Sequence, residues 1–456
     1  MNKSSVDPSI FRDYDIRGIY PTQVNEDVYY QIGCAIASYF RKSPIAVGFD
    51  GRLSSAGLFE SLSKGITGMG CDVVNLGLIS TDMHNFASGF YQFPANIMIS
   101  ASHNPGQYNG IKIIRQGAVP IHGQKGLPEI KQTVLSGRFK PVAKKRGQIS
   151  RRDITHDWIK YATGLIDLKK MKSLKVVIDA GNGVGGISWQ QLTGKSRLKI
   201  IPLYFTPDGN FPHHPPDPLQ KDNLKDLRRE IKINKADLGF AIDGDGDRIF
   251  ILDENGNQLS GTITTAILAE YFLHKFGPNN ILYNVVVGKI VPETITGNGG
   301  NPIRVRVGHS FIKEAMQKNQ AVFAGEHSGH FYFKGLFNAD SSFVAGLYFL
   351  AFLSAEGRKL SRIVKEFDKY YQSGEINFRV LDKDKMVGII LRKFPSGKTD
   401  NLDGLSIWYD KWWLNLRSSK TEPFLRLNLE AETKDILLDQ LAKIEDIIIK
   451  AGGKKD

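Results

Sequence analysis

The chain has 456 residues, too many for a single hydrophobic core, so three or four domains are expected. Hydrophobic residues make up 41% of the chain and charged residues 23%, the composition of an ordinary folded protein. The net charge of +13 suits nucleic acid or an anionic small substrate, but the basic clusters are short and scattered, which argues against nucleic acid.

The N-terminal part shows no sign of export. Residues 1–9 lack the apolar segment of a signal peptide. Cys34 lies in the apolar run 31–40, where a buried structural thiol is favoured over a reactive one, and Cys71 is the other cysteine. The longest apolar stretch, residues 343–355, is too short to cross a bilayer and predicts a buried helix. We therefore expect a cytoplasmic protein with no membrane partner.

A β-branched or apolar run that ends at a Gly/Asp-rich turn recurs along the chain, and it predicts α/β domains whose working loops lie at strand ends. A basic linker and two later turns divide the chain. The last part ends in an amphipathic helix, in which Leu437, Leu441, Ile444 and Ile448 recur before Gly452. The four predicted domains span residues 1–148, 149–252, 253–371 and 372–456.

The first polar loop, residues 100–106, reads Ser-Ala-Ser-His-Asn-Pro-Gly. A serine displayed on such a turn could be a nucleophile, although the adjacent His103 is poorly placed to act as its base and no Asp is evident to orient that histidine. A plain polar turn between two strands remains the alternative. Lys112 follows on the next strand-like run, where its charge could neutralise a phosphate held on Ser102.

The second loop, residues 243–248, reads Asp-Gly-Asp-Gly-Asp-Arg. Its glycines let the backbone curl so that three carboxylates can face one hard cation. A calcium loop of the EF-hand type would need glycine where Arg248 stands, and helices on both sides where this chain has strand-like runs. Three carboxylates suit Mg²⁺, which keeps positions for water and phosphate oxygen, and Arg248 indicates that phosphate is the remaining ligand.

The third loop, residues 325–330, reads Gly-Glu-His-Ser-Gly-His and has a good composition for binding sugar hydroxyls. His327 and His330 could instead bind zinc, but no third ligand accompanies them at a recognisable spacing. Read alone, this loop leaves both interpretations open.

The fourth loop, residues 417–426, combines two guanidinium groups, an ammonium and several hydroxyls, which make a cradle for a dianion. In the strand that follows, Leu425, Leu427 and Leu429 share one face, so Arg426 points to the other. A basic surface turn is the alternative.

Taken in order, these loops resemble the α-D-phosphohexomutase superfamily over nearly the whole chain. The opening segment 11–18, Phe-Arg-Asp-Tyr-Asp-Ile-Arg-Gly, matches the N-terminal motif of that family. The resemblance implies three related α/β domains and a C-terminal α+β domain around a central cleft. It implies the catalytic residues Ser102, His103, Lys112, Arg17, Arg248 and His330, and the metal ligands Ser102, Asp243, Asp245 and Asp247. It implies the substrate-binding residues Tyr14, His309, Glu326, Ser328, Arg417, Ser419, Lys420, Thr421 and Arg426.

The implied activity is the interconversion of hexose 1-phosphate and hexose 6-phosphate, of mannose or glucose. It would proceed through a phosphoserine and a hexose 1,6-bisphosphate, which is both intermediate and activator, with Mg²⁺ as cofactor. A phosphoglucosamine mutase and a phosphosugar-binding protein without turnover are the alternatives. Residues 108–110 and His330 fit the phosphomannomutase/phosphoglucomutase branch. Lys420 replaces an asparagine usual there, and Val286 stands where a basic residue is frequent, with Lys289 as the alternative cation.

Overall fold

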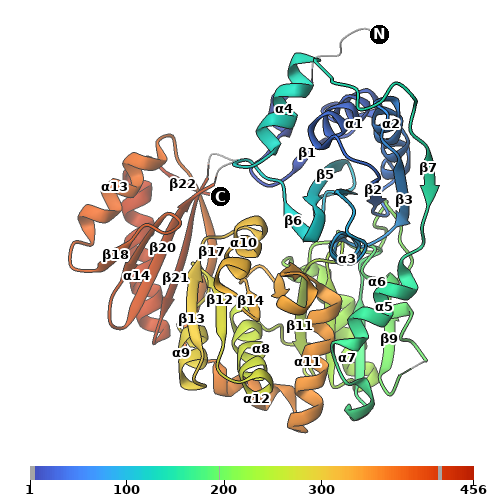
Figure 1. The fold of residues 1–456 in the computed structure, drawn as a ribbon. Helices are drawn as coiled ribbons and strands as arrows, with labels where there is room; N and C mark the ends of the chain where they lie inside the picture. The colour runs from blue at the N-terminus through green and yellow to red at the C-terminus, as the bar shows by residue number, and fades with distance from the viewer. Residues whose placement is uncertain (1–5, 195, 420–423) are drawn as a thin grey trace.

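The computed structural model describes residues 6–194, 196–419 and 424–456. Over these residues the strands form four sheets, which belong to four consecutive parts of the chain. Figure 1 shows the first part at the upper right, the second and third below it, and the fourth at the left. Short 3₁₀ helices lie at Pro8–Ile10, Gln116–Ala118, Leu168–Lys170, Lys221–Leu224 and Lys334–Leu336.

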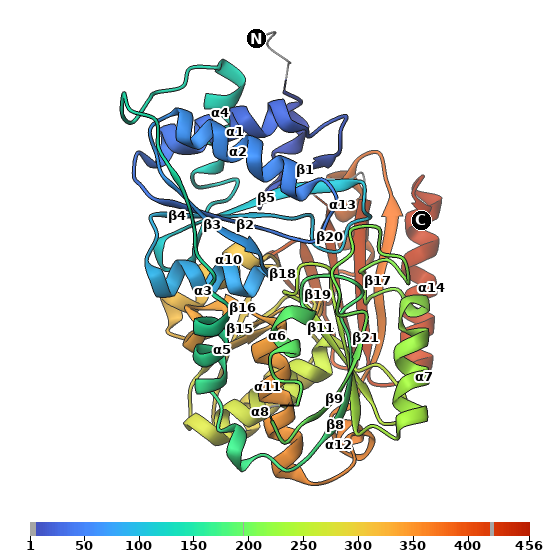
Figure 2. The ribbon, with the colours of Figure 1, turned by 90° about the vertical axis from the view of Figure 1, so that its right-hand side faces the viewer.

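The first sheet has the strand order β1-β5-β4-β2-β3-β7, with β6 paired to β5. Strands β4, β2 and β3 run parallel, and every residue of β4 is buried because helices cover both faces of the sheet. Helices α1 and α2 pack on one face and α3 on the other (Figure 2). The elements are β1 (Ile16–Ile19), α1 (Glu26–Phe40), β2 (Ile45–Phe49), α2 (Ser55–Gly68), β3 (Val73–Leu78), α3 (Thr81–Tyr91), β4 (Ala95–Ile99), β5 (Tyr108–Arg115), β6 (Val119–Pro120), α4 (Leu127–Ser136) and β7 (Ile149–Arg151).

Strand β7 differs from the division predicted from the sequence. Residues 149–151, placed there at the start of the second domain, pair in parallel with β3 at the edge of the first sheet. Their side chains are all exposed, so no apolar pattern marks them as a strand.

The second sheet has the order β11-β10-β8-β9, and only β11 runs antiparallel to its neighbour. Its elements are α5 (Thr155–Gly164), β8 (Lys175–Asp179), α6 (Gly186–Gln190), β9 (Lys199–Leu203), α7 (Lys225–Asn234), β10 (Leu238–Ile242) and β11 (Ile249–Asp253). The strands predicted on both sides of the loop 243–248 are therefore confirmed as β10 and β11.

The third sheet has the order β13-β12-β14-β15-β16, and its first three strands are parallel. The buried helix predicted over 343–355 is confirmed as α11, which Ser341 caps at its N-terminus and Gly357 ends with φ +65°. The elements are α8 (Gly261–Phe276), β12 (Asn280–Asn284), α9 (Ile290–Gly297), β13 (Asn301–Val305), α10 (His309–Asn319), β14 (Phe323–Gly325), β15 (Phe331–Phe333), β16 (Ala339–Asp340), α11 (Ser342–Glu356) and α12 (Leu360–Phe367).

The fourth sheet is antiparallel throughout, with the order β18-β19-β20-β21-β17-β22, and it makes the C-terminal part an α+β domain. The amphipathic C-terminal helix is confirmed as α14, which buries Leu437, Ile444 and Ile448. The elements are β17 (Tyr371–Arg379), α13 (Lys383–Lys393), β18 (Lys398–Asp400), β19 (Leu405–Trp408), β20 (Trp412–Ser418), β21 (Phe424–Ala431), α14 (Lys434–Lys450) and β22 (Lys454–Lys455).

One hydrophobic core runs through the first three parts, each of which also has a smaller core of its own, whereas the core of the fourth part is separate. Phe86 of α3 contacts Trp158 of α5 with ring centroids 5.4 Å apart, and Trp158 in turn lies 5.8 Å from Phe343 of α11. The fourth part meets the third mainly through polar contacts, described below. Of the described helices, none is both long and apolar enough to span a membrane.

Candidate active site

The first polar loop follows β4 and holds Ser102 in a buried, left-handed conformation with φ +53°. Ser102 Oγ donates a hydrogen bond of 2.9 Å to Asp243 Oδ2 of the second part and lies 3.4 Å from His103 Nδ1. The pKa of His103 lies well below its usual value, because Arg248 is close and because the imidazole is buried. The serine hydroxyl thus faces the carboxylates of another sheet.

Arg52 binds this loop through the backbone carbonyls of the loop. The sequence did not indicate this contact. The two terminal nitrogens of Arg52 donate to four backbone carbonyls, and its Nε pairs with Asp50 Oδ2 at 3.1 Å. The sequence signal that could have found Arg52 is the Gly/Asp turn that directly follows β2. Such a turn predicts a functional loop at the strand end, but it does not show which residues the loop contacts. The accepting carbonyls are those of Ser102 (2.8 Å), Asn104 (2.6 Å), Pro105 (2.7 Å) and Tyr108 (3.0 Å).

The loop between β10 and β11 gathers three buried carboxylates, those of Asp243, Asp245 and Asp247. Asp243 Oδ1 accepts from the backbone amides of Gly246, Asp247 and Arg248 at 3.1–3.2 Å, which fixes the curl of the loop. Burial, and then the neighbouring carboxylates Asp247 and Asp245, raise the pKa of Asp243 well above its usual value. Like charges held this close call for a compensating cation.

The three carboxylates fit a hard divalent cation. One oxygen from each lies within 4.8 Å of the others, and Asp245 Oδ1 is buried with no hydrogen-bond partner among the described residues. The calcium-loop alternative is not supported, because strands flank the loop. In addition, Glu254, which stands where a calcium loop has its twelfth and last ligand, accepts hydrogen bonds from the hydroxyl and amide of Ser361 instead.

The first part contributes two groups to this cluster. Lys112 Nζ lies 2.6 Å from both Asp245 Oδ2 and Asp247 Oδ2. Burial lowers the pKa of Lys112, but these two carboxylates outweigh it and raise the pKa above its usual value. Thr81, at the start of α3, donates its hydroxyl to Asp245 Oδ2 at 2.7 Å, and no sequence pattern indicated this contact.

The third loop connects β14 and β15 and presents Glu326 in a buried position. Glu326 Oε2 accepts from Asn284 Nδ2 at 2.9 Å and Oε1 from the hydroxyl of Tyr332 at 2.5 Å. The sequence did not indicate either partner. Both lie in strands, where the sequence alone suggests that a polar side chain faces solvent. The two hydrogen bonds orient the carboxylate and leave further lone pairs for another donor.

The two histidines of this loop point to different partners, so they do not form a shared zinc site. His327 Nδ1 lies 3.0 Å from the hydroxyl of Thr262, whereas His330 Nε2 accepts from Arg248 Nε at 3.2 Å and lies 3.4 Å from Asp247 Oδ1. His330 Nδ1 lies 3.0 Å from Ser328 Oγ.

The buried carboxylate of Asp340, in β16, lies near His330. The sequence did not indicate that these two residues are neighbours. One ligand atom each of Asp340, Asp247 and His330 lie within 4.8 Å of one another. Asp340 is paired with Lys313 at 2.9 Å, so its charge is already balanced.

The N-terminal motif also reaches these loops. Arg17, in β1, donates to Asn104 Oδ1 and pairs with Asp15, both at 2.5 Å. Tyr14 donates its hydroxyl to the Val307 carbonyl at 3.3 Å, and burial, followed by the Asp403 carboxylate, raises its pKa to about 12.

Tyr14 also packs against the start of α10. Its ring centroid lies 5.7 Å from that of His309, and burial followed by Lys313 lowers the His309 pKa to about 3. Between Val307 and His309, Gly308 adopts φ +124°, and a Cβ there would lie 2.8 Å from the Tyr14 ring. A side chain at position 308 would therefore push Tyr14 away.

The fourth loop joins β20 and β21, where Arg417 and Arg426 lie directly opposite each other. Leu425, Leu427 and Leu429 are buried on the other face, as the alternation predicts. Ser419 is buried and its amide donates to the Phe424 carbonyl at 2.8 Å. Lys420 and Thr421 lie outside the described residues.

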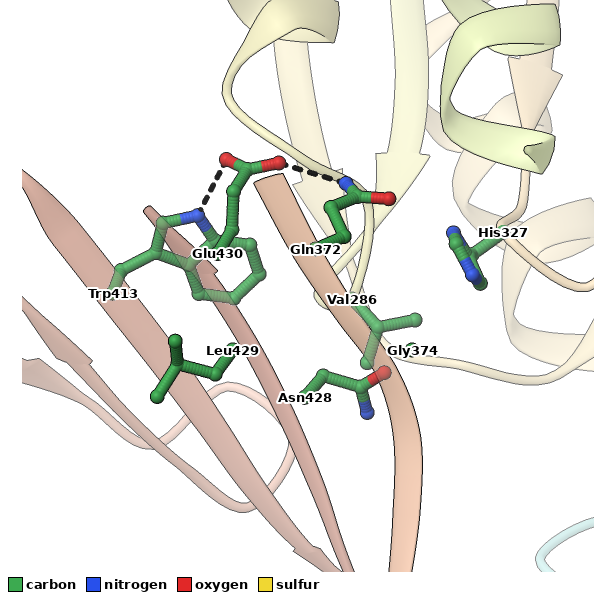
Figure 3. A pocket seen from close by; sticks show the side chains of 8 residues that line it. All are labelled: Val286, His327, Gln372, Gly374, Trp413, Asn428, Leu429 and Glu430. Carbon is green, nitrogen blue, oxygen red and sulfur yellow. Dashed lines mark hydrogen bonds between the residues drawn. The ribbon is translucent and has the colours of Figure 1, made fainter. Parts of the chain in front are cut away.

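A small pocket lies between the third and fourth parts (Figure 3). Val286 and His327 line it from the third part, and Glu430 anchors the opposite wall by accepting from Trp413 Nε1 and Gln372 Nε2. Lys289, the alternative to the basic residue missing at position 286, donates its ammonium to the Asp410 carbonyl at 2.8 Å and so binds the fourth part.

Comparisons with known proteins agree with this arrangement. The three family descriptions "Phosphoglucomutase/phosphomannomutase, alpha/beta/alpha domain" I, II and III match residues 8–140, 156–256 and 260–370. A phosphomannomutase of Methanocaldococcus jannaschii is 38% identical over 447 residues, which cover 97% of this chain and 98% of that protein. A protein of Xanthomonas campestris named phosphohexose mutases is 35% identical, over 94% of this chain and 96% of its own length.

A crystal structure of a phosphoglucomutase/phosphomannomutase family protein from Burkholderia thailandensis superposes with a TM-score of 0.90, at 28% identity and over 99% of both chains. The likeness thus extends through the fourth part, beyond the three matched domains. The chain belongs to the phosphoglucomutase/phosphomannomutase family and is a phosphohexomutase.

Proposed function

We propose that this phosphohexomutase interconverts the 1-phosphates and 6-phosphates of mannose and glucose by passing a phosphoryl group through Ser102. The buried hydroxyl of Ser102, 2.9 Å from Asp243 in a cluster of three carboxylates, is the observation that carries the proposal. Lys112 and Arg248 lie against the same carboxylates. A serine in a merely structural turn has no need of this charged surrounding.

We assign Asp243, Asp245, Asp247 and an oxygen on Ser102 as ligands of Mg²⁺. When bound, the ion would neutralise charge on the transferring phosphoryl group, which is most of what catalysis requires in a loose phosphoryl-transfer transition state. Arg17, Lys112 and Arg248 are the protein's own positive charges for the same purpose.

In the first transfer, the 6-hydroxyl oxygen of hexose 1-phosphate attacks the phosphorus on Ser102. The new bond joins phosphorus to O6, and the bond from phosphorus to Ser102 Oγ breaks. His330 Nε2 takes the proton of the 6-hydroxyl, and the same number of protons, one, is returned to Oγ by way of solvent, so the serine ends as a hydroxyl and His330 ends neutral. In the second transfer Oγ attacks the other phosphorus of the hexose 1,6-bisphosphate, the bond to O1 breaks, and the protons move in the opposite sense.

His330 suits the role of base because Asp247 Oδ1, at 3.4 Å, would stabilise the imidazolium that forms. His103 is the second candidate and also touches Ser102 Oγ. Its lowered pKa keeps it neutral and able to accept a proton, but the same shift makes it a weaker base than an ordinary histidine.

The substrate's other phosphate would bind between Arg417, Ser419 and Arg426, together with Lys420 and Thr421, while Glu326 and Ser328 accept sugar hydroxyls. Tyr14 and His309 would line the side of the sugar. Because the bisphosphate must turn over between the two transfers, these groups must accept the sugar in both orientations.

Closure of the fourth part would keep the bisphosphate in the cleft and water away from the phosphoserine. Its contacts with the third part are polar: Arg304 pairs with Asp400 at 2.5 Å, and the Val307 amide donates to Asp403 Oδ2 at 2.9 Å. The carbonyl of the same Val307 accepts from Tyr14, so one residue contacts both the first and the fourth part. Parts joined in this way, without a shared core, are free to move relative to one another.

A single assay separates this proposal from its alternatives. Purified protein with hexose 1-phosphate, Mg²⁺ and a trace of bisphosphate is expected to form hexose 6-phosphate without net release of inorganic phosphate. Stoichiometric release of phosphate would indicate a phosphatase, and binding without conversion would indicate a phosphosugar-binding protein.

Substrate choice provides a further prediction. We expect turnover of mannose 1-phosphate and glucose 1-phosphate and much slower turnover of glucosamine 1-phosphate. The two hexoses differ only in the direction of the 2-hydroxyl, and a site that accepts the sugar in two orientations has little basis for rejecting either. Glucosamine adds an ammonium beside Lys112, Lys420 and several arginines, and the like charges should disfavour it. Comparison of kcat/KM for the three compounds decides, and a clear preference for glucosamine 1-phosphate would identify a phosphoglucosamine mutase.

A further inference from the structure

The phosphate cradle of the fourth part already contains a carboxylate. Glu375, on β17, places Oε2 3.3 Å from Arg417 Nη2 and Oε1 3.5 Å from Arg426 Nη1. It therefore binds both arginines, with one oxygen for each. An anionic side chain is unexpected in a cradle for a phosphate dianion, since the two negative charges repel each other.

The backbone is shaped to aim this carboxylate at the arginines. Gln372 pairs with Glu430 and Glu375 with Asn428, so β17 has one more residue than β21 between these two pairs. Without that bulge, Glu375 would lie opposite the buried Leu427, with its side chain in the core. With it, Glu375 points to the face that carries Arg426, two residues from its partner Asn428.

Two residues build the bulge. Gly374 adopts φ +69°, a conformation that favours glycine, and Ser373 Oγ accepts from the Leu429 amide at 3.0 Å. The side chain of Glu375 is 35% exposed, so it can release the arginines without leaving a buried charge behind.

The arginines need such a counter-charge whenever no phosphate is bound. Arg417 and Arg426 form a directly opposed pair across β20 and β21, an arrangement that destabilises a sheet when the charges are alike. Glu375 relieves this repulsion in the free cradle and opposes the phosphate in the occupied one.

We propose that Glu375 is an internal counter-anion, which pairs with Arg417 and Arg426 when phosphate is away and weakens their hold on it when it is present. The inference rests on the proposed function, in which the hexose 1,6-bisphosphate must leave the cradle and return in the opposite orientation. A cradle of arginines alone would bind the phosphate more tightly and release it more slowly. Glu375 takes the place of the departing phosphate beside the two arginines and so favours the reorientation of the bisphosphate.

The test is the affinity for inorganic phosphate, measured by isothermal titration calorimetry on the full chain. Glu375→Gln keeps the shape and removes the charge, and it is expected to tighten phosphate binding about fivefold, the scale of one charge removed beside a partly hydrated dianion. Glu432→Gln makes the same charge change just past the end of β21, six residues or about 20 Å along the strand direction from Arg426, and is the matched control, expected to match wild type. In the Arg417→Met background the gain from Glu375→Gln is expected to shrink.

The possible failures are distinguishable. If Arg417→Met does not weaken phosphate binding at all, the cradle assigned in the proposed function is wrong. If Arg417→Met weakens binding but Glu375→Gln leaves it unchanged or also weakens it, Glu375 only orients the arginines, and the counter-anion proposal is overturned. Steady-state kinetics add a second readout: Glu375→Gln should lower both KM and kcat, whereas a role in orientation alone would raise KM.

Discussion

Replacing Ser102 by alanine is expected to lower mutase activity by roughly a thousandfold or more, the scale of losing one essential covalent group. The fold should survive, because Asp243 Oδ1 keeps its three backbone donors and Arg52 binds main-chain carbonyls that the substitution leaves in place. Turnover in the coupled assay and the thermal unfolding midpoint are the two measurements.

The matched control is Ser136→Ala, at the exposed end of α4, which should behave as wild type. Retention of more than a few per cent of wild-type turnover by Ser102→Ala would rule out a covalent relay through this serine.

Asp245→Asn is expected to abolish turnover at ordinary Mg²⁺ concentrations and to raise the half-saturating concentration strongly. The substitution removes one of three carboxylates from a site with no spare charge. It also removes a partner of Lys112 and of Thr81, so some loss of thermal stability is expected as well. Calorimetric titration with Mg²⁺ in the absence of substrate gives a readout that does not depend on activity.

Asp222→Asn is the control for this change. It lies in the same part of the chain, with a side chain that is 84% exposed, and should leave both the affinity for Mg²⁺ and the unfolding midpoint unchanged. An unaltered half-saturation point in Asp245→Asn would remove the metal assignment while leaving the role of Ser102 open.

The sequence predicted well those features that depend on local pattern. The helix α11 follows from an uninterrupted apolar run, and the buried face of β21 follows from the alternation of Leu425, Leu427 and Leu429. The acidic loop was identifiable because alternate carboxylates separated by glycine constrain the backbone by themselves. The strands on both sides of that loop were identifiable because each is a short apolar run.

Features that depend on contacts between distant segments were not predictable in this way. Asn284 and Tyr332 orient Glu326 from two different strands, and Arg52 binds a loop about fifty residues further along the chain. A polar residue in a strand has the same local signature whether it faces water or a buried partner. Only the tertiary structure distinguishes the two.

The bulge at Ser373 and Gly374 illustrates a second limit. A regular pairing of β17 with β21 would place Glu375 in the core, where a carboxylate would be costly, and only the observed pairing locates the extra residue that avoids this. The short strand β7 presents a third. Its exposed side chains give no periodic signal, and only backbone pairing with β3 assigns it to the first sheet.

The phosphoryl transfer itself is most directly tested by following a label through Ser102. The protein is incubated with hexose 1,6-bisphosphate that carries ³²P, freed of excess label, digested and analysed by mass spectrometry; a second portion receives unlabelled hexose 1-phosphate. Label is expected on the peptide that contains Ser102, and it should pass to sugar phosphate within a single turnover. Label on another residue, or label that stays on the protein while turnover proceeds, would contradict transfer through Ser102.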